Sequence, residues 1–231
     1  MGELLRTGLN GSALAGLLSG LALLDAPASR PSFVQGMGRW LGWADAIPLA
    51  AALNTPWHGS TTPSRRASSA GAVEREFERV RAALLRSIDD ATGTAGSRRR
   101  GPTSDDSDFD GHRQRYVALQ QAMHAAIEPL RAQLREAVAQ QSPESGRLAA
   151  LDAVMAQVLA PREQQLLGLM PTLLEPHFAR LRWAAQDAPP TQWLALFRKD
   201  MQCLLHAELE LRLQPVQGLI DALRSPPQGS P

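Results

Sequence analysis

Apolar residues recur every three or four positions over long stretches of the C-terminal half. One such series comprises Tyr116, Leu119, Met123, Ile127, Leu130, Leu134 and Val138. This spacing places the side chains on one face of an α-helix. Pro129 lies inside the series and should kink the helix, because proline removes one backbone hydrogen bond and clashes with the preceding turn. The pattern predicts a long, kinked helix with one buried face.

Further series of the same kind follow. After the helix-starting pair Ser142-Pro143, the apolar positions are Leu148, Leu151, Val154, Val158 and Leu159. We expect Pro161 to break or restart this helix, before an irregular stretch that contains Pro171 and Pro176 and has Leu166, Leu167, Met170, Leu174, Phe178 and Leu181 as its apolar positions.

The last helix is expected to follow the stop at 188–191. Its apolar positions are Trp193, Phe197, Met201, Leu204, Leu205, Leu209, Leu213, Val216, Ile220 and Leu223. Residues 208–214 alternate with period two, as a strand would. They contain no β-branched residue, however, and the spacing of three and four continues through them, so a helix is predicted.

The N-terminal part alternates apolar and polar segments. The apolar stretch Leu14 to Leu24 is shorter than the about 20 residues of a membrane span. It also lacks the basic flank of a signal peptide, since Glu3 offsets Arg6. We therefore interpret it as a buried helix. A clear amphipathic helix follows, with Val73, Phe77, Val80, Leu84 and Ile88 on one face.

These patterns predict an all-α protein, an elongated bundle of long kinked antiparallel helices with a short N-terminal helical piece. The expected divisions are an N-terminal piece (1–54), a linker (55–71), an amphipathic helix (72–91), a charged flexible linker (92–110), a long-helix bundle (111–224) and a disordered tail (225–231).

The stretch from Ser32 to Asn54 combines aromatic residues with glycines and reads as two short helices. Ser32 and Asp45 are the expected caps, and Pro48 is tolerated in the first turn of the second helix. Buried aromatic residues usually serve packing, so one interpretation is a tightly packed corner of the core. The other is a docking surface for a partner helix, with Phe33, Trp40 and Trp43 as candidate partner-binding residues.

Composition narrows the classes of function. A hydrophobic content of 44% allows a real core, and a net charge of +1 gives no global attraction to nucleic acid or membrane. Cys203 is the one cysteine, which excludes an intramolecular disulfide and a zinc site made of several thiolates. We expect a cytoplasmic protein without direct membrane insertion.

Motifs for catalysis and metal binding are missing or incomplete. Residues 106–111 match the opening of a calcium-binding loop, but Val117 stands where the loop needs a bidentate glutamate. None of the five histidines has another histidine three or four residues away. The sequence also lacks a phosphate-binding loop and a nucleophile elbow. We therefore predict no enzyme activity, no catalytic residue, no metal site and no cofactor.

The cations are almost all arginine, whose planar guanidinium suits phosphate and carboxylate groups. Clusters and pairs of them form a candidate nucleic-acid-binding set: Arg98, Arg99, Arg100, Arg131, Arg135, Arg180, Arg182, Arg198 and Lys199. The alternative is a set of solvated helix faces with scattered ion pairs, since no aromatic residues interleave with the basic ones.

The first 55 residues resemble an uncharacterised family of bacterial proteins common in beta- and gamma-proteobacteria. The resemblance rests on Arg6-Thr7-Gly8, Ser29-Arg30, Ser32-Phe33, Gly38 to Leu41, Asp45-Ala46-Ile47, Leu49 and Ala51 to Leu53. Family members lie in operons with a MotA-like membrane protein and an OmpA/MotB-like wall-binding protein. This arrangement is similar to the type III Zorya anti-phage system.

The resemblance implies a function that composition alone does not suggest. It implies a non-enzymatic cytosolic accessory or interaction subunit of an anti-phage defence complex, working with a MotA/MotB-like membrane motor. The expected partners are the other subunits of the operon, and long apolar helix faces also favour a homodimer. A nucleic-acid-binding effector or sensor subunit that uses the arginines is the alternative.

Overall fold

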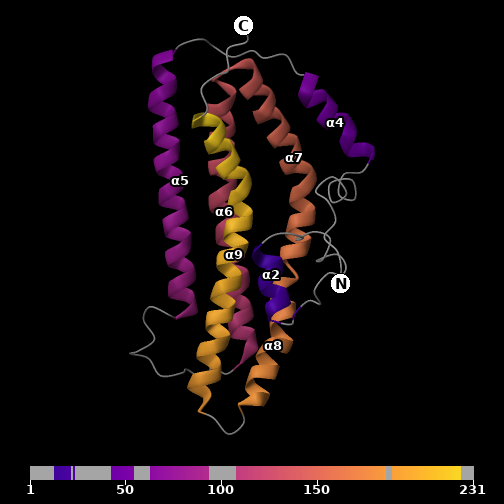
Figure 1. The fold of residues 1–231 in the computed structure, drawn as a ribbon, viewed down its shortest axis with the longest axis vertical. Helices are drawn as coiled ribbons and strands as arrows, with labels where there is room; N and C mark the ends of the chain where they lie inside the picture. The colour runs from indigo at the N-terminus through magenta and orange to yellow at the C-terminus, as the bar shows by residue number, and fades with distance from the viewer. Residues whose placement is uncertain are drawn as a thin grey trace. The chain divides into compact units, whose positions relative to one another are not determined.

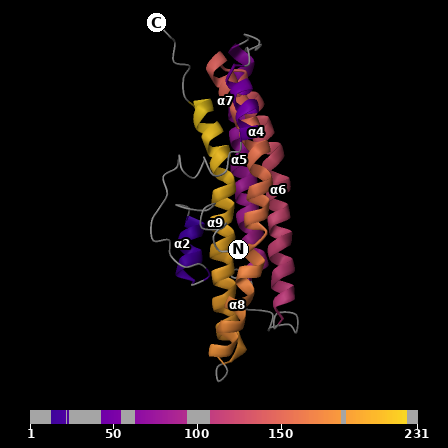
Figure 2. The same ribbon diagram turned by 90° about the vertical axis from the view of Figure 1, so that its right-hand side faces the viewer.

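The computed structural model describes residues 13–21, 23, 43–54, 63–93, 108–185 and 189–224. Every regular element in these ranges is an α-helix (Figures 1 and 2). The helices are α2 (Ala13–Gly20), α4 (Trp43–Asn54), α5 (Pro63–Thr92), α6 (Phe109–Ala139), α7 (Pro143–Leu167), α8 (Met170–Ala184) and α9 (Pro190–Arg224). The predicted all-α bundle of packed long helices is confirmed.

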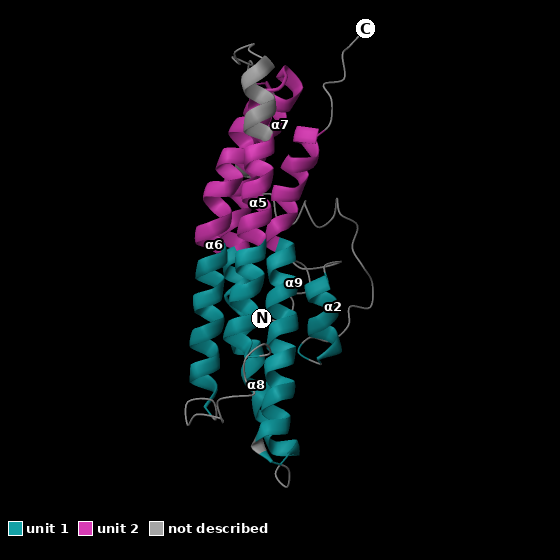
Figure 3. Ribbon diagram, turned by 90° about the vertical axis from the view of Figure 1, so that its left-hand side faces the viewer, with its two compact units in different colours: residues 1–31, 82–123, 164–211 teal, residues 32–81, 124–163, 212–231 magenta. Residues whose placement is uncertain are grey.

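The chain divides into two units (Figure 3). Unit 1 contains residues 1–31, 82–123 and 164–211, and unit 2 contains residues 32–81, 124–163 and 212–231. The boundaries fall inside α5, α6, α7 and α9, whereas the sequence placed its divisions in the linkers. A long helix can contribute separate turns to two interiors, and hydrophobic spacing alone does not reveal where one interior ends.

The apolar series on α6 and α9 are buried as predicted. On α6, all seven positions from Tyr116 to Val138 are buried. On α9, the same holds for every position of its predicted series, including the stretch that alternates with period two. The apolar segment near the N-terminus also forms a helix, α2, with Leu14 and Leu18 fully buried.

The helices continue through most prolines, and the expected break at Pro161 is wrong. Helix α7 runs past Pro161 and ends at Leu167, and Gly168 and Leu169 form a turn before α8. The Leu169 N–H donates to the Leu166 carbonyl at 3.2 Å, a tighter turn than an α-helix makes. Pro171 then stands in the first turn of α8, where proline is tolerated. The packed helix absorbs one lost bond at Pro161, whereas the turn at 168–169 redirects the chain.

Helix α5 is longer than predicted. It begins at Pro63, inside the expected linker of residues 55–71, and extends to Thr92. Its end is set by Gly93, whose φ of 74° lies in the left-handed region that only glycine adopts at low cost. The Thr92 hydroxyl donates to the Ile88 carbonyl at 2.8 Å and so satisfies one of the last carbonyls of the helix.

Several sequence predictions lie outside the described residues. These include the candidate residues Phe33, Trp40, Arg98, Arg99 and Arg100, the charged linker from 94 to 107 and the tail from 225. Trp43 begins α4, but its side chain is likewise outside the description. All of these remain predictions.

Candidate functional site

Arg131 and Arg135, one turn apart on α6 in unit 2, share one carboxylate. Arg131 donates from Nε to Asp152 Oδ2 at 2.9 Å and from Nη2 to Oδ1 at 2.6 Å. Arg135 Nη1 donates to Oδ2 at 3.2 Å. The side chains of Arg131 and Asp152 are both only 13% exposed. This two-pronged pair, the strong geometry for arginine and carboxylate, ties α6 to α7 and gives both arginines a structural role.

Because Asp152 faces α6, the opposite side of α7 turns outward. Ala149, beside it, is buried. At about 100° per residue, four large apolar side chains form a stripe centred on the side of α7 away from Ala149: Leu151, Val154, Met155 and Val158. All four are only half-buried, and Leu148 near their edge is 42% exposed. We call these four residues the outer face of α7.

The outer face corrects the sequence analysis. The apolar spacing on α7 suggested a core-facing stripe, yet the structure places small alanines and ion-paired acids toward the neighbouring helices. Glu163, near the end of the helix, pairs with Arg212 of α9 at 3.4 Å. A helix with apolar residues on all sides is normally enclosed. The neighbouring elements cover the apolar side chains of α7 only in part.

Unit 1 contains a cluster of aromatic rings where α8 packs on α9. Phe178 of α8 meets Phe197 and Trp193 of α9 edge to face, with ring centroids 5.0 and 5.1 Å apart. From α6, Phe109 and His112 contact Phe178 at 5.6 and 5.7 Å. Such tilted and edge-on pairs add about 0.5–1.5 kcal/mol each beyond the burial of their area. The cluster fixes the position of α8 along α9.

A chain of polar groups lies next to this cluster. His177 Nε2 is 2.8 Å from Asp200 Oδ2, and His177 Nδ1 is 2.8 Å from Arg180 Nη2. A guanidinium can only donate, so Nδ1 accepts and the ring proton is on Nε2, facing Asp200. The same Arg180 Nη2 donates to the Leu21 carbonyl at the end of α2, at 2.7 Å. The chain therefore holds α2, α8 and α9 together.

A second polar network is buried deeper in unit 1. Glu208 of α9 is fully buried, and its Oε2 accepts a bond of 2.9 Å from the Tyr116 hydroxyl. Gln120 Nε2 donates to both Glu208 oxygens at 3.0 Å and to the Leu167 carbonyl at 2.8 Å. That carbonyl would normally bond the N–H four residues later, which Pro171 lacks. Gln120 thus satisfies a carbonyl at the α7–α8 turn.

Exposed side chains occur near the end of α8 and in the first three turns of α9. Trp183 is 73% exposed, and its neighbour Arg182 is exposed too. On α9, Leu196 is 48% exposed and Lys199, one turn further, is exposed. Neither Arg182 nor Lys199 forms an ion pair with another residue that the structure describes.

The nine predicted nucleic-acid candidates therefore separate into different settings. Arg131 and Arg135 are held by Asp152, and Arg180 is bonded to His177 and Leu21. Arg198 is half-buried and has an interaction partner. Among the candidates with described side chains, Arg180, Arg182 and Lys199 are exposed and have no ion pair to a described residue, and of these three Arg180 is held by hydrogen bonds.

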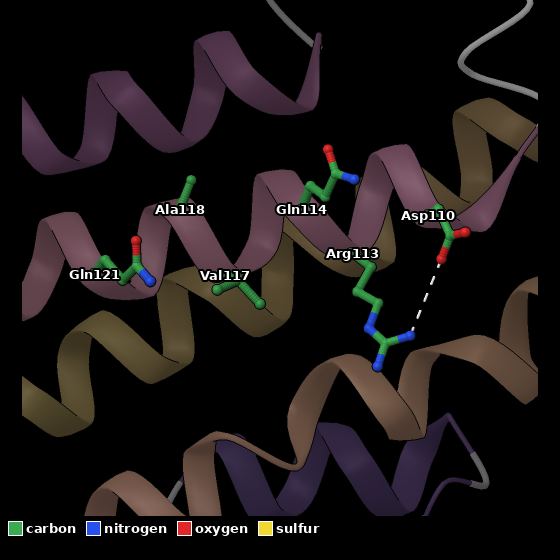
Figure 4. Close-up of a pocket in the computed structure, with 6 residues that line it drawn as sticks. All are labelled: Asp110, Arg113, Gln114, Val117, Ala118 and Gln121. Atoms are coloured by element: carbon green, nitrogen blue, oxygen red, sulfur yellow. Dashed lines mark ion pairs between the residues drawn. The ribbon is translucent and has the colours of Figure 1, made fainter.

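A surface groove on α6 lacks the clustered reactive or metal-binding side chains of a functional site. It is lined by Asp110, Arg113, Gln114, Val117, Ala118 and Gln121, all on one exposed helix (Figure 4). Asp110 and Arg113 form a solvent-exposed ion pair at 4.0 Å. Elsewhere among the described residues, no group of three or more histidine, cysteine, aspartate or glutamate side chains could hold a metal ion. Every helix in those ranges is too short or too polar to cross a membrane.

Two features that the sequence analysis missed, the exposed Trp183 and the buried Glu208, have recognisable signals in the sequence. Trp183 is out of step with the apolar series at Phe178 and Leu181, which marks it as outward-facing. Glu208 is in step with Leu204 and Leu205, which places a carboxylate among core positions. By contrast, nothing in the local sequence indicates that Asp200 meets His177, since 23 residues separate them.

Comparison with known protein families gives one match. Residues 1–225 match the family described as "Protein of unknown function (DUF3348)". The chain belongs to this family. No curated protein matches the chain, and no solved structure does. The family assignment agrees with the predicted resemblance to an uncharacterised domain family and extends it from the first 55 residues to nearly the whole chain.

Proposed function

We propose that this member of the family is a non-enzymatic, cytoplasmic interaction subunit of a bacterial anti-phage defence complex of the Zorya type. In that complex it works with a MotA/MotB-like membrane motor. The resemblance of the N-terminal residues to proteins found beside such motors motivates the proposal. The outer face of α7 is the structural observation that carries it, because a half-covered aliphatic face on a surface helix suits a protein partner.

The chemistry of this face favours a partner helix. Leu151, Val154, Met155 and Val158 are spaced by three, one and three residues, which forms one stripe along α7. Stripes of this kind pack against an apolar helix in a groove or a coiled coil. The Asp152 ion pair fixes the rotation of α7, and so it keeps the stripe turned outward.

The first experiment deletes the gene in its intact operon and measures phage plating. Unchanged plating would rule out the defence role. The second experiment compares tagged wild-type protein with the double variant Leu151→Ser, Val158→Ser after nuclease treatment of the lysate. We expect the motor subunits or another subunit of the operon to be recovered with the wild type and lost with the variant.

Two controls make the second experiment specific. Gln133→Ser alters an exposed side chain of α6 in unit 2 and should keep the partners. Far-ultraviolet circular dichroism should show that the double variant stays folded, because half-buried side chains contribute less stability than core ones. Equal recovery of the motor subunits with wild type and folded double variant would place the partner surface elsewhere.

A second candidate function is nucleic-acid binding, as an effector or sensor subunit. The observation that favours it is on α8, where the exposed Trp183 directly follows the exposed cation Arg182. The test is binding of a labelled oligonucleotide at increasing salt, since phosphate contacts make affinity fall steeply with salt concentration. A protein that binds no oligonucleotide at low salt would eliminate this candidate.

A further inference from the structure

The two sides of α7 differ in the size of their side chains. At about 100° per residue, one side carries four alanines: Ala149, Ala153, Ala156 and Ala160. The other side is the outer face, with Leu148 at its edge. Ala149 is buried, whereas the four residues of the outer face are half-buried and Leu148 is 42% exposed. The large aliphatic side chains of α7 are therefore on the side that the rest of the protein covers only in part.

A residue of opposite charge stands at each end of the outer face. Glu144 is exposed near the start of α7, and Arg162 is half-buried near its end. They are 18 positions apart. This is five turns of about 3.6 residues, so both side chains lie on one line along the helix, and Leu151 is within about 20° of that line. Neither Glu144 nor Arg162 forms an ion pair with another residue that the structure describes.

This order of charges fits a second α7 that runs in the opposite direction. In a two-fold symmetric pair of subunits, each contact occurs twice, because the same surface patch is used by both copies. When Glu144 is level with Arg162 of the second copy, the reciprocal pair forms at the other end of the helices. Two parallel copies of α7 would instead place like charges together at both ends. The charges of α7 are thus complementary to themselves in the antiparallel arrangement.

The same register brings apolar residues of the outer face together between the charged ends. Leu148 is then level with Val158 of the second copy. Leu151 is likewise level with Met155, and both contacts occur twice. In pairs of long helices, apolar residues form the seam, and charges beside the seam set the orientation and the choice of partner. An unrelated helix would have to match this order of charges by coincidence, whereas a second copy matches it by symmetry.

We propose that the outer face of α7 binds the same face of a second copy of this chain. The two helices are antiparallel, and Glu144 of each copy pairs with Arg162 of the other. The proposal rests on the proposed function in taking the outer face as an interaction surface, and it names the partner helix. The subunit therefore joins the other components of the complex as a dimer.

The experiment measures the mass of the purified full chain by analytical ultracentrifugation over a range of micromolar concentrations. Wild type should shift from monomer to dimer as concentration rises. Glu144→Arg places two arginines together at each end of the helix pair, and Arg162→Glu places two glutamates together there. Each variant should raise the dissociation constant of the dimer about 10- to 30-fold, because two exposed ion pairs are replaced by two repulsions.

Restoring opposite charges should restore the dimer. The double variant Glu144→Arg, Arg162→Glu exchanges the two charges, and its dissociation constant should lie within about threefold of the wild-type value. Mixing the two single variants should also give a dimer, since one chain then has arginine at both positions and the other has glutamate. Loss of the dimer in each single variant and its return in the mixture are expected when these two residues meet across the copies.

Glu128→Arg and Arg86→Glu are the matched controls. They make the same changes of charge at exposed positions of α6 and α5, so the dissociation constant of the dimer should not change. Far-ultraviolet circular dichroism should show that every variant is folded, because no altered side chain is part of the core. The double variant Leu151→Ser, Val158→Ser should remain a monomer, since it removes the apolar seam.

Two results would overturn the proposal. If wild type stays monomeric at every concentration, the second copy is not the partner, and recovery of the motor subunits still decides the proposed function by itself. If wild type dimerises and both single variants dimerise equally well, the dimer uses another surface. If instead the single variants are monomers that still recover the motor subunits, the dimer is supported and the proposed function does not depend on it.

Discussion

Units 1 and 2 fill their interiors with different chemistry. Among the described residues, unit 1 buries five aromatic side chains, whereas Phe77 is the one aromatic ring buried in unit 2. Unit 1 also buries four polar residues, Thr92, His112, His177 and Glu208, against Ser142 in unit 2. The charged groups that unit 2 uses to join its helices, Arg131, Arg135 and Asp152, lie at the edge of its interior.

This difference bears on what each unit presents to the outside. Buried polar groups and fitted rings accept few alternative arrangements, so the helices of unit 1 are fixed in register. A fixed register of helices suits a surface whose side chains keep one arrangement. The aliphatic side chains of unit 2 are interchangeable in shape, and one ion pair decides which side of α7 faces inward. That suits an adaptable apolar surface.

The largest expected effect comes from removing the centre of the aromatic cluster. Phe197 is fully buried and contacts Phe178, Phe109, His112 and His177. Phe197→Ala should lower the free energy of unfolding by about 3–5 kcal/mol, measured by denaturant titration. Hydrogen exchange should show the loss of protection within unit 1. The adjacent exposed change Leu196→Ala should cost less than about 0.5 kcal/mol, and equal costs would refute the contrast.

The next effect tests the ion pair of unit 2. Asp152→Ala leaves two largely buried arginines without their carboxylate and should cost about 3 kcal/mol in denaturant titration. The exposed acid Asp221 provides a control in the same unit, and Asp221→Ala should change stability by less than about 0.5 kcal/mol. Replacing both Asp152 and Arg131 by apolar residues should recover part of the loss. A cost below about 1 kcal/mol for Asp152→Ala would mean that packing alone orients α7.

A smaller effect is expected for the buried network of unit 1. Glu208→Leu removes the acceptor for the Tyr116 hydroxyl and for Gln120, which should cost about 2 kcal/mol in unfolding free energy. Glu208→Gln keeps one oxygen acceptor and should cost less. If the leucine variant is as stable as wild type, the buried network does not fix the positions of the unit 1 helices. The proposed difference between the two units would then be contradicted.

The smallest effect concerns the start of α7. Ser142 caps this helix by accepting the Ser145 N–H at 3.1 Å, and Ser142→Ala should cost about 1 kcal/mol. Ser87→Ala, on the exposed side of α5, is the control and should change little. A variant that loses no stability would show that the packing of unit 2 holds the start of the helix without the cap.

The same change can be followed at Glu144. Its own backbone N–H and the Ser142 hydroxyl lower the pKa of the Glu144 carboxyl. The charged form is therefore favoured by folding, and its contribution is present above the unfolded pKa and lost as pH falls through the lowered one. Ser142→Ala should raise the pKa in an NMR titration. An unchanged pKa would mean that the backbone bond alone sets it.

Most helices could be predicted from the spacing of apolar residues, because a helix that packs in a bundle needs one apolar face. Tyr116 to Val138 on α6 and Trp193 to Leu223 on α9 show this directly. The starts and ends were less predictable. Pro161 does not end α7, and Pro63 begins α5 inside an expected linker. A break depends on whether the surrounding packing compensates one missing hydrogen bond, and a local sequence does not contain that information.

The candidate site residues also show which properties the sequence predicts and which depend on tertiary packing. The sequence singled out Arg131, Arg135, Arg182 and Lys199 as equals, because all are cations on helices. The structure separates them, since Arg131 and Arg135 are bound to Asp152, whereas Arg182 and Lys199 are exposed. Which arginine finds a carboxylate depends on the rotation of a neighbouring helix.

By itself, the sequence determined that the protein is helical, which turns of α6 and α9 are buried, and that one cysteine forms no internal disulfide. These follow from spacing and composition. Only the tertiary structure decided that the large aliphatic residues of α7 are half-buried, that His177 meets Asp200, and that Trp183 is exposed. The physical reason is that burial and ion pairing depend on two helices that meet, whereas the local sequence pattern describes only one of them.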